Sequence, residues 1–251
     1  MACRIAVQAM GMTGTGPRDE SLTSISLLPG AIEGVETNYY IQGEGAERSL
    51  TRNPRRGQVL FFSNGAGEVR AADQVFEFSG VAAFLPPVNT PVLIRATSSA
   101  LECLEILMDF QDHEIALRPP RGPYFILYSQ CEPYSEAIKS PRTVSRTIVP
   151  ANTIPRFCMG SVETVGPDEV APHAHPMLEQ LFFGLPGNAC VVTADDAEAA
   201  LGERALLHIP LGSQHGVRVA EGNRMHYIWM DFFRHEEDLA YIQEQHKPIK
   251  R

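Results

Sequence analysis

The chain repeats itself at an offset of 121 to 122 residues, and this repeat constrains the fold more than any other feature. Leu60-Phe61-Phe62 pairs with Leu181-Phe182-Phe183 at an offset of 121, and Met108-Asp109-Phe110 pairs with Met230-Asp231-Phe232 at 122. The pairs Pro29 with Pro150 and Gly45 with Gly166 keep the same order and spacing. Ordered matches at a nearly constant offset predict two homologous halves, at about 20–112 and 140–234.

Within each half the pattern is that of short strands. β-branched or aromatic runs are separated by Gly, Asn and Asp turn residues about every 8 to 12 positions, which is typical of antiparallel barrels and sandwiches. Residues 197–201, between Asp195-Asp196 and Gly202, are predicted to form a hairpin strand, and residues 124–128 a short strand in the connector. A helix is expected only from His235, ending before Pro248. The sequence therefore predicts an all-β protein with domains at 1–120 and 121–251 and a short C-terminal helix.

Composition excludes several classes of protein. Hydrophobic residues make up 44% of the chain and charged residues 20%, which indicates a globular protein. The net charge of −9 would repel a nucleic-acid backbone, so we expect no nucleic-acid partner. The five cysteines include no CxxC pair and indicate neither a disulfide framework nor a thiolate zinc site. We find no signal-peptide pattern and no apolar run near the roughly 20 residues of a membrane span, so we expect a cytoplasmic protein without membrane contact.

One cluster of residues is predicted to hold a metal. His173 and His175 stand at i and i+2 of an extended segment, so both side chains point to the same face. Glu179 keeps this period-two phase if the chain stays extended or turns once into the strand that begins at Leu178. His215 opens a later strand, after the turn residues Pro210 and Gly212, and is the candidate for the remaining ligand. Three imidazoles and one carboxylate would bind one divalent transition metal, Mn, Fe, Co, Ni or Zn.

Residues 166–187 and 202–219 resemble the two signature motifs of the cupin superfamily. The first has a glycine, HxHxxxE and a second glycine, and the second has a glycine, PxG and a histidine. With the internal repeat, the chain resembles a bicupin, two tandem jelly-roll barrels also called double-stranded β-helices. The resemblance implies that His173, His175, Glu179 and His215 bind the metal. The architecture is similar to that of the ureidoglycine aminohydrolases, although that family replaces the first histidine by glutamate and the last by glutamine.

In the first half, the positions that correspond to these ligands hold residues that do not form a transition-metal site. At an offset of 121 they are Arg52, Pro54, Gln58 and, within a residue or two, Leu93. We therefore expect a degenerate first barrel without a metal. Arg52, Arg55 and Arg56 are interpreted as part of a solvated loop rather than as an anion site.

The expected function is that of a metal-dependent enzyme that acts on a small polar metabolite, carboxylated or hydroxylated. The metal would be a Lewis acid or an O₂-binding centre, in an isomerase, hydrolase or dioxygenase. Glu179 is the candidate base if it leaves the metal. The alternatives are a non-catalytic protein that binds or senses a small molecule, and a barrel pair whose metal only stabilises the fold. His226 and Tyr227 are the candidate titratable residues near the site, and exposed edge strands favour a homodimer.

Overall fold

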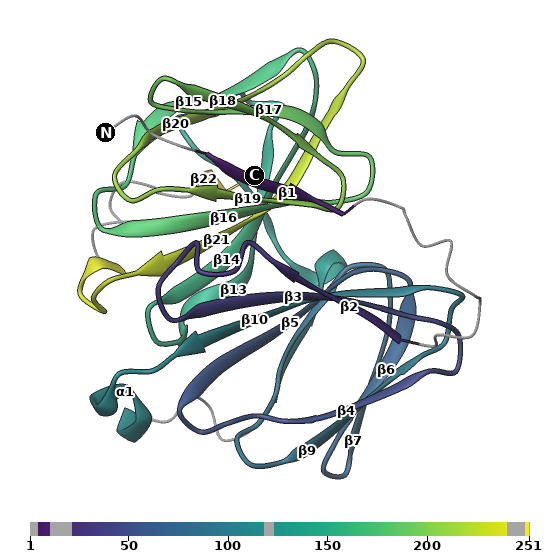
Figure 1. The fold of residues 1–251 in the computed structure, drawn as a ribbon. Coiled ribbons are helices and arrows are strands. Elements are labelled where there is room, and N and C mark those ends of the chain that lie inside the picture. The colour runs from purple at the N-terminus through teal and green to yellow at the C-terminus, as the bar shows by residue number, and fades with distance from the viewer. Residues whose placement is uncertain (1–4, 11–21, 118–122, 240–248, 251) are drawn as a thin grey trace. The chain divides into compact units, whose positions relative to one another are not determined.

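The computed structural model describes residues 5–10, 22–117, 123–239 and 249–250. The chain divides into two compact units: the first unit comprises residues 12–130, and the second unit comprises residues 1–11 and 131–251. Nearly all elements are antiparallel strands (Figure 1), which confirms the all-β prediction. Of the helix expected from His235, residues 238 and 239 are helical, and most of the rest lies outside the described residues.

The first unit is built from two sheets that enclose a core of side chains including Leu60, Phe62, Val69 and Ile94. Its larger sheet has the strand order β11 (Tyr124–Leu127), β8 (Ala82–Leu85), β5 (Arg56–Asn64), β10 (Leu101–Asp109), β3 (Val35–Gln42) and β2 (Leu22–Leu27). Its smaller sheet has the order β4 (Glu47–Thr51), β9 (Pro91–Ala96), β6 (Ala66–Ala71) and β7 (Gln74–Ser79). A 3₁₀ turn, η1 (Tyr128–Gln130), follows β11.

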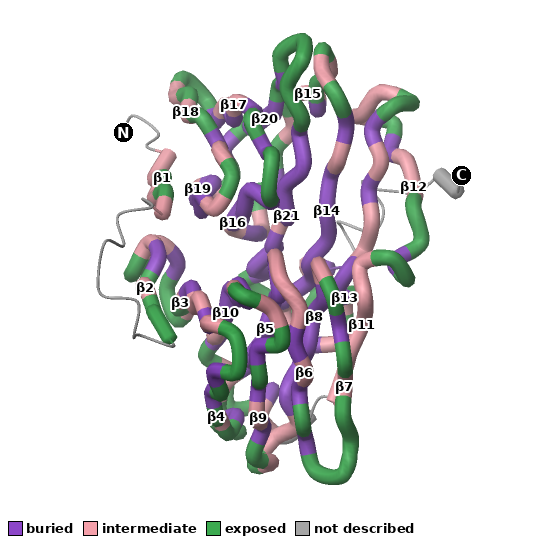
Figure 2. The backbone as a smooth tube through the Cα atoms, turned by 90° about the vertical axis from the view of Figure 1, so that its right-hand side faces the viewer, coloured by how far each residue is buried: buried purple, intermediate pink, exposed green. Residues whose placement is uncertain are grey.

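The second unit repeats this plan around a core that includes Phe182, Val192, Leu207 and Val217. Its larger sheet has the order β1 (Ala6–Ala9), β19 (Ala205–Ile209), β16 (Leu178–Gly184), β21 (Arg224–Phe233), β14 (Phe157–Val165), β13 (Val144–Ile154), β12 (Pro133–Ser135) and β22 (Ile249–Lys250). Its smaller sheet has the order β15 (Asp168–Ala174), β20 (Gln214–Val219), β17 (Ala189–Ala194) and β18 (Ala197–Gly202). β18 confirms the predicted hairpin strand. Figure 2 shows β14, β16 and β21 as mostly buried.

Strand β1 begins the chain but pairs inside the second unit. Ala6 lies opposite His208 and Ala9 opposite Ala205 of β19, so β1 runs beside β19 in Figure 1. Ile5 packs against the core of the second unit. From the sequence, residues 6–9 are expected in the first domain, because a four-residue strand shows no pattern that indicates which distant strand it pairs with. The pairing covers an edge of β19 that would otherwise expose unpaired backbone groups.

A six-residue helix, α1 (Asp112–Leu117), follows β10 and was not expected from the sequence. One half of a capping box closes its first turn: the Gln111 N–H donates to the buried carboxylate of Glu114 at 2.6 Å. The Glu114 N–H donates in turn to the Gln111 carbonyl. In the described part of the chain, helices are too short or too polar to cross a bilayer.

The structure corrects the register of the repeat by one residue at β5 and β16. Each of these strands lies inside its larger sheet, β5 between β8 and β10 and β16 between β19 and β21. Leu60 and Phe62 face the core of the first unit, and Phe182 faces that of the second. Phe182 therefore corresponds to Leu60, not Phe61, at an offset of 122, which aligns Gln180 with Gln58. A continuous apolar run such as LFF does not alternate, so the sequence did not define its phase.

We predict that removing residues 1–9 destabilises the second unit. The loss of the β1–β19 ladder and of the Ile5 contact should cost on the order of 2 kcal/mol, about the value of one buried aliphatic side chain. Urea unfolding followed by fluorescence of Trp229, the chain's single tryptophan, reports on this unit. The control, Val7→Ser, changes an exposed side chain and keeps the ladder. An unchanged midpoint in the truncated protein would contradict the structural role of β1.

Candidate metal centre

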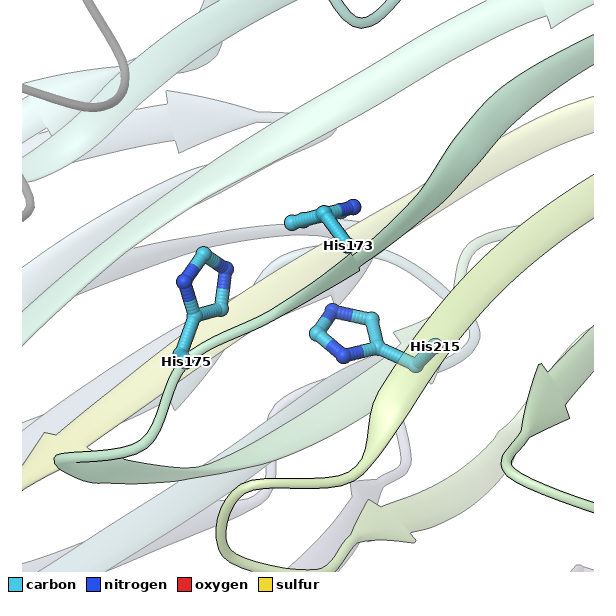
Figure 3. Close-up of side chains that lie close together, drawn as sticks. All are labelled: His173, His175 and His215. Atoms are coloured by element: carbon cyan, nitrogen blue, oxygen red, sulfur yellow. The ribbon is translucent and has the colours of Figure 1, made fainter.

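Three of the four predicted ligands come together in the second unit. His173 lies on β15 directly opposite His215 on β20, and His175 follows the end of β15. Ring centroids are 4.5 Å apart for His173 and His215, 4.8 Å for His173 and His175, and 5.3 Å for His175 and His215. Figure 3 shows the three rings around a common space. His175 and His215 are buried, and His173 is half-buried.

Two of the imidazoles are held in one tautomer by the backbone. Nδ1 of His173 lies 2.9 Å from the Ala171 carbonyl oxygen, and Nδ1 of His215 lies 3.1 Å from that of Ser213. Because a carbonyl oxygen only accepts, each Nδ1 carries the proton and donates it. Nε2 of both rings is then the nitrogen without a proton, which is the state that metal ligation requires.

The spacing of the three imidazoles fits one ion. One nitrogen from each ring lies within 4.8 Å of the others. Zn–N bonds are about 2.0–2.1 Å long, so two nitrogens on one ion stand at most about 4.2 Å apart. Binding of one ion would therefore require rotations that bring the three ring nitrogens closer together. Within the part of the chain that the structure describes, this is the group of His, Cys, Asp or Glu residues that meets the distance requirement.

The fourth predicted ligand, Glu179, lies outside this cluster. Its Oε2 is 2.9 Å from Nε2 of His208, and neither residue is among those that line the cavity described below. The prediction of Glu179 as ligand and base assumed that the inward phase would be kept after His175, whether the chain stayed extended or turned once. The chain turns through Pro176 and Met177 between β15 and β16, and this turn shifts the inward phase by one residue.

The inward residue after this turn is Gln180. Its Nε2 donates to Oδ1 of Asp231 at 2.7 Å, and a carboxylate has no proton to offer, so the amide nitrogen must face Asp231. Oε1 therefore points the other way, where it is buried and has no hydrogen-bond partner among the described residues. Leaving such an acceptor unpaired costs about 1–3 kcal/mol. Gln180 is not among the residues predicted from the sequence, although Pro176 is a turn signal that marks a change of phase.

The histidines and Gln180 line one cavity of about 890 Å³ in the second unit. Its walls come from both sheets and from the segment after β12. Apolar and aromatic side chains form most of the wall, among them Ile138, Val162, Val170, Phe182, Val217, Tyr227, Trp229, Phe233 and Leu239. Predominantly apolar walls with a few converging polar groups are typical of small-molecule sites.

Lys139 and Glu136 form a buried ion pair on this wall. Lys139 Nζ contacts Oε2 of Glu136 and donates to Oγ of Ser145 at 2.8 Å, and the Lys139 and Glu136 side chains are each 6% exposed. Burial lowers the pKa of Lys139 to about 7, while the charge of Asp231 acts in the opposite direction. A backbone bridge to Val170 holds Lys139 beside β15. From the sequence, Glu136 and Lys139 are expected only to belong to the connector between the two halves, because this connector carries no periodic pattern.

Of the two titratable candidates in β21, the structure places Tyr227 in the cavity and His226 on the opposite face of the strand. Tyr227 is buried and its ring centroid lies 4.7 Å from that of Phe182. Nε2 of His226 lies 3.7 Å from Oε2 of Glu163. Burial is the main cause that lowers the pKa of His226 to about 4, and Glu163 opposes it.

In the first unit, the residues aligned with the ligands serve other contacts. Nε2 of Gln58 donates to Glu105 at 2.8 Å, and Arg48 contacts the same carboxylate oxygen at 3.3 Å. Arg52 does not lie in a solvated loop, as the sequence analysis expected. It is 4% exposed and donates to the carbonyls of Arg56 and Pro86. Its inward position follows from alternation along and beyond β4, where Arg48 is also buried.

Comparison with known proteins supports the fold. No family model matches the chain, and no curated protein does. Solved structures match with low identity. The protein Ylba from E. coli superposes with a TM-score of 0.70 at 11% identity, covering 91% of this chain and 90% of its own. The cupin 2 conserved barrel domain protein from Leptotrichia buccalis superposes with a TM-score of 0.59 at 16% identity, covering 87% of this chain and 92% of its own.

Oxalate decarboxylase from Bacillus subtilis is a third match, with a TM-score of 0.63 at 12% identity over 86% of this chain and 72% of the enzyme. At these identities the likeness concerns the fold alone. The chain has the cupin fold, with two jelly-roll barrels in tandem.

We predict that His226 makes the second unit less stable in acid. Above pH 6.5, the usual histidine pKa, His226 is neutral in both states and has no effect. As the pH falls from 6.5 toward 4, the unfolded chain binds a proton that the folded chain does not, so stability decreases. In the presence of a chelator, His226→Gln should reduce the loss of unfolding free energy between pH 7.5 and pH 5 by roughly 1–2 kcal/mol.

Urea unfolding followed by Trp229 fluorescence measures this effect. The matched control is His235→Gln, which changes an exposed histidine and should keep the pH dependence of the unaltered protein. Parallel pH profiles for His226→Gln and the unaltered protein would show that His226 is not the group responsible.

Proposed function

We propose that the second unit is a metal-dependent enzyme site in which His173, His175, His215 and Gln180 hold one divalent transition metal. The substrate would be a small metabolite that chelates through oxygen. The observation that carries this proposal is that three clustered imidazoles share one cavity with Gln180, whose amide oxygen is buried and has no hydrogen-bond partner among the described residues. Binding of an ion would give that oxygen the partner it lacks.

The proposed donor set differs in charge from the one predicted from the sequence. Three imidazoles and an amide are neutral, so a divalent ion keeps both positive charges at the site, whereas Glu179 would have cancelled one. When bound, the metal would supply Lewis acidity to a chelated carbonyl or carboxylate. Three nitrogens and one oxygen suit the divalent first-row ions from Mn to Zn.

The chain's own residues supply functions that favour an enzyme over a passive binder. Asp231 holds the amide of Gln180 in one orientation. Lys139, with a pKa of about 7 in the cavity wall, is able to donate or accept a proton near neutral pH. The apolar walls exclude water from the bound molecule, which strengthens the electrostatic effect of both groups.

Comparison with solved structures adds support. The oxalate decarboxylase from Bacillus subtilis, which shares the fold, has Mn(II) centres. A metal centre inside this kind of barrel is therefore compatible with turnover. Its substrate is not carried over to this chain, because identity is 13%.

The test compares substitutions at the two neighbouring residues Glu179 and Gln180. Gln180→Leu should lower the affinity for Co²⁺ or Mn²⁺ by about tenfold or more, since it removes one proposed ligand together with the amide that donates to Asp231. Glu179→Gln should leave the affinity unchanged, because Glu179 contacts His208 instead. His175→Ala should abolish stoichiometric binding. Metal analysis after gel filtration and competition with a chromophoric chelator measure these effects.

Two outcomes would contradict the proposal. If the unaltered protein binds no transition metal, the second unit has no metal centre. If Glu179→Gln loses the metal and Gln180→Leu retains it, the ligand set predicted from the sequence is the right one.

A further inference from the structure

The cavity is much larger than a chelating group alone. Ligand pockets have volumes of about 300–1,000 Å³, and this one, at about 890 Å³, is near the upper end. A molecule of only a few atoms at the histidines would leave water against apolar walls, which is unfavourable. The size of the cavity therefore favours a ligand that extends well beyond the metal.

The apolar side chains of the cavity wall suit an apolar body. Val162 and Trp229 come from the larger sheet, Val217 comes from the smaller sheet, and all three line the cavity. Phe182 and Tyr227 form an aromatic pair with centroids 4.7 Å apart and planes inclined by 33°. Such a wall offers aromatic faces and branched aliphatic surface to a planar or branched hydrocarbon group.

The charges in the cavity restrict the charge of the ligand. Lys139 and Glu136 contact each other and cancel. The Asp231 carboxylate adds one negative charge, and the four proposed ligands add none. With a divalent ion the buried charge is therefore +1, and exposed Glu132 adds a negative charge at the rim. A monoanion neutralises the interior, whereas a dianion leaves an excess negative charge among apolar walls, which is costly.

We infer that the substrate is a monoanion with two chelating oxygens at one end and an apolar body of about the size of an aromatic ring or larger at the other. This inference rests on the proposed metal site and specifies the class of molecule that the site accepts. It adds an apolar body to the small polar metabolite expected from the sequence, because the sequence did not reveal the apolar wall or Gln180.

The test uses three probe ligands on the Co²⁺-loaded protein at pH 6.5. Benzohydroxamate and acetohydroxamate share one chelating group that binds as a monoanion, and only the first has an aromatic body. Oxalate is a dianionic oxygen chelator with no body. We expect benzohydroxamate to bind at least tenfold more tightly than either of the others. Calorimetry gives the affinities, and fluorescence of Trp229 reports locally because this residue lines the cavity.

Two charge variants test the second part of the inference. Lys139→Met leaves the Glu136 carboxylate without its counter-charge and should weaken benzohydroxamate binding about threefold or more, whereas the double replacement Lys139→Met with Glu136→Gln removes both charges and should restore it. Restoration by the second replacement is not expected if the substitutions only loosen the wall. The ligand series on the unaltered protein remains decisive if either variant does not fold.

Metal content measured on the same samples separates the two levels of the proposal. If the protein binds Co²⁺ but has equal affinities for the two hydroxamates, or binds oxalate more tightly, the inference about the substrate is wrong and the metal centre stands. Failure to bind Co²⁺ in the absence of any chelator would instead overturn the metal centre itself.

Discussion

The pairing of β16 with β21 determines which side chains face the cavity of the second unit. It places Gln180 opposite Asp231 and Phe182 opposite Trp229, so one face of the two strands supplies an amide, a carboxylate and two aromatic rings. The hydrogen bond from Gln180 to Asp231 then orients the amide and leaves its oxygen unpaired. The proposed donor set, its neutral charge and the preference for a monoanion all depend on this arrangement.

The sequence was sufficient for the parts of the molecule that follow from pattern. Turn spacing and the repeat predicted the all-β tandem fold. The i, i+2 spacing predicted that His173 and His175 share a face, and the turn before His215 together with the cupin-like motif predicted that His215 would join them. The sequence was not sufficient where a shift of one residue decides which side chain faces the cavity. The turn at Pro176 moved the inward position from Glu179 to Gln180, and long-range contacts such as those of β1 and Lys139 leave no local periodicity to detect.

The two barrels differ in the surroundings of two equivalent inward glutamines, Gln58 and Gln180. In the first unit, Gln58 and Arg48 both contact the buried carboxylate of Glu105, although Nε and Nη2 of Arg48 have no hydrogen-bond partner among the described residues. In the second unit, the Gln180 nitrogen donates to Asp231, and its oxygen has no hydrogen-bond partner among the described residues. The second unit differs because Gln180 lines a cavity together with three clustered histidines. We therefore propose that a bound group is the partner of its amide oxygen.

The most direct test of this account is the anomalous scattering of crystals grown with Co²⁺, measured at the cobalt edge. We predict one peak per chain in the second unit, within bonding distance of imidazole nitrogens of His173, His175 and His215 and of Oε1 of Gln180. A peak bound to Glu179 in place of Gln180, or no peak among the three histidines at full occupancy of added metal, would contradict the account.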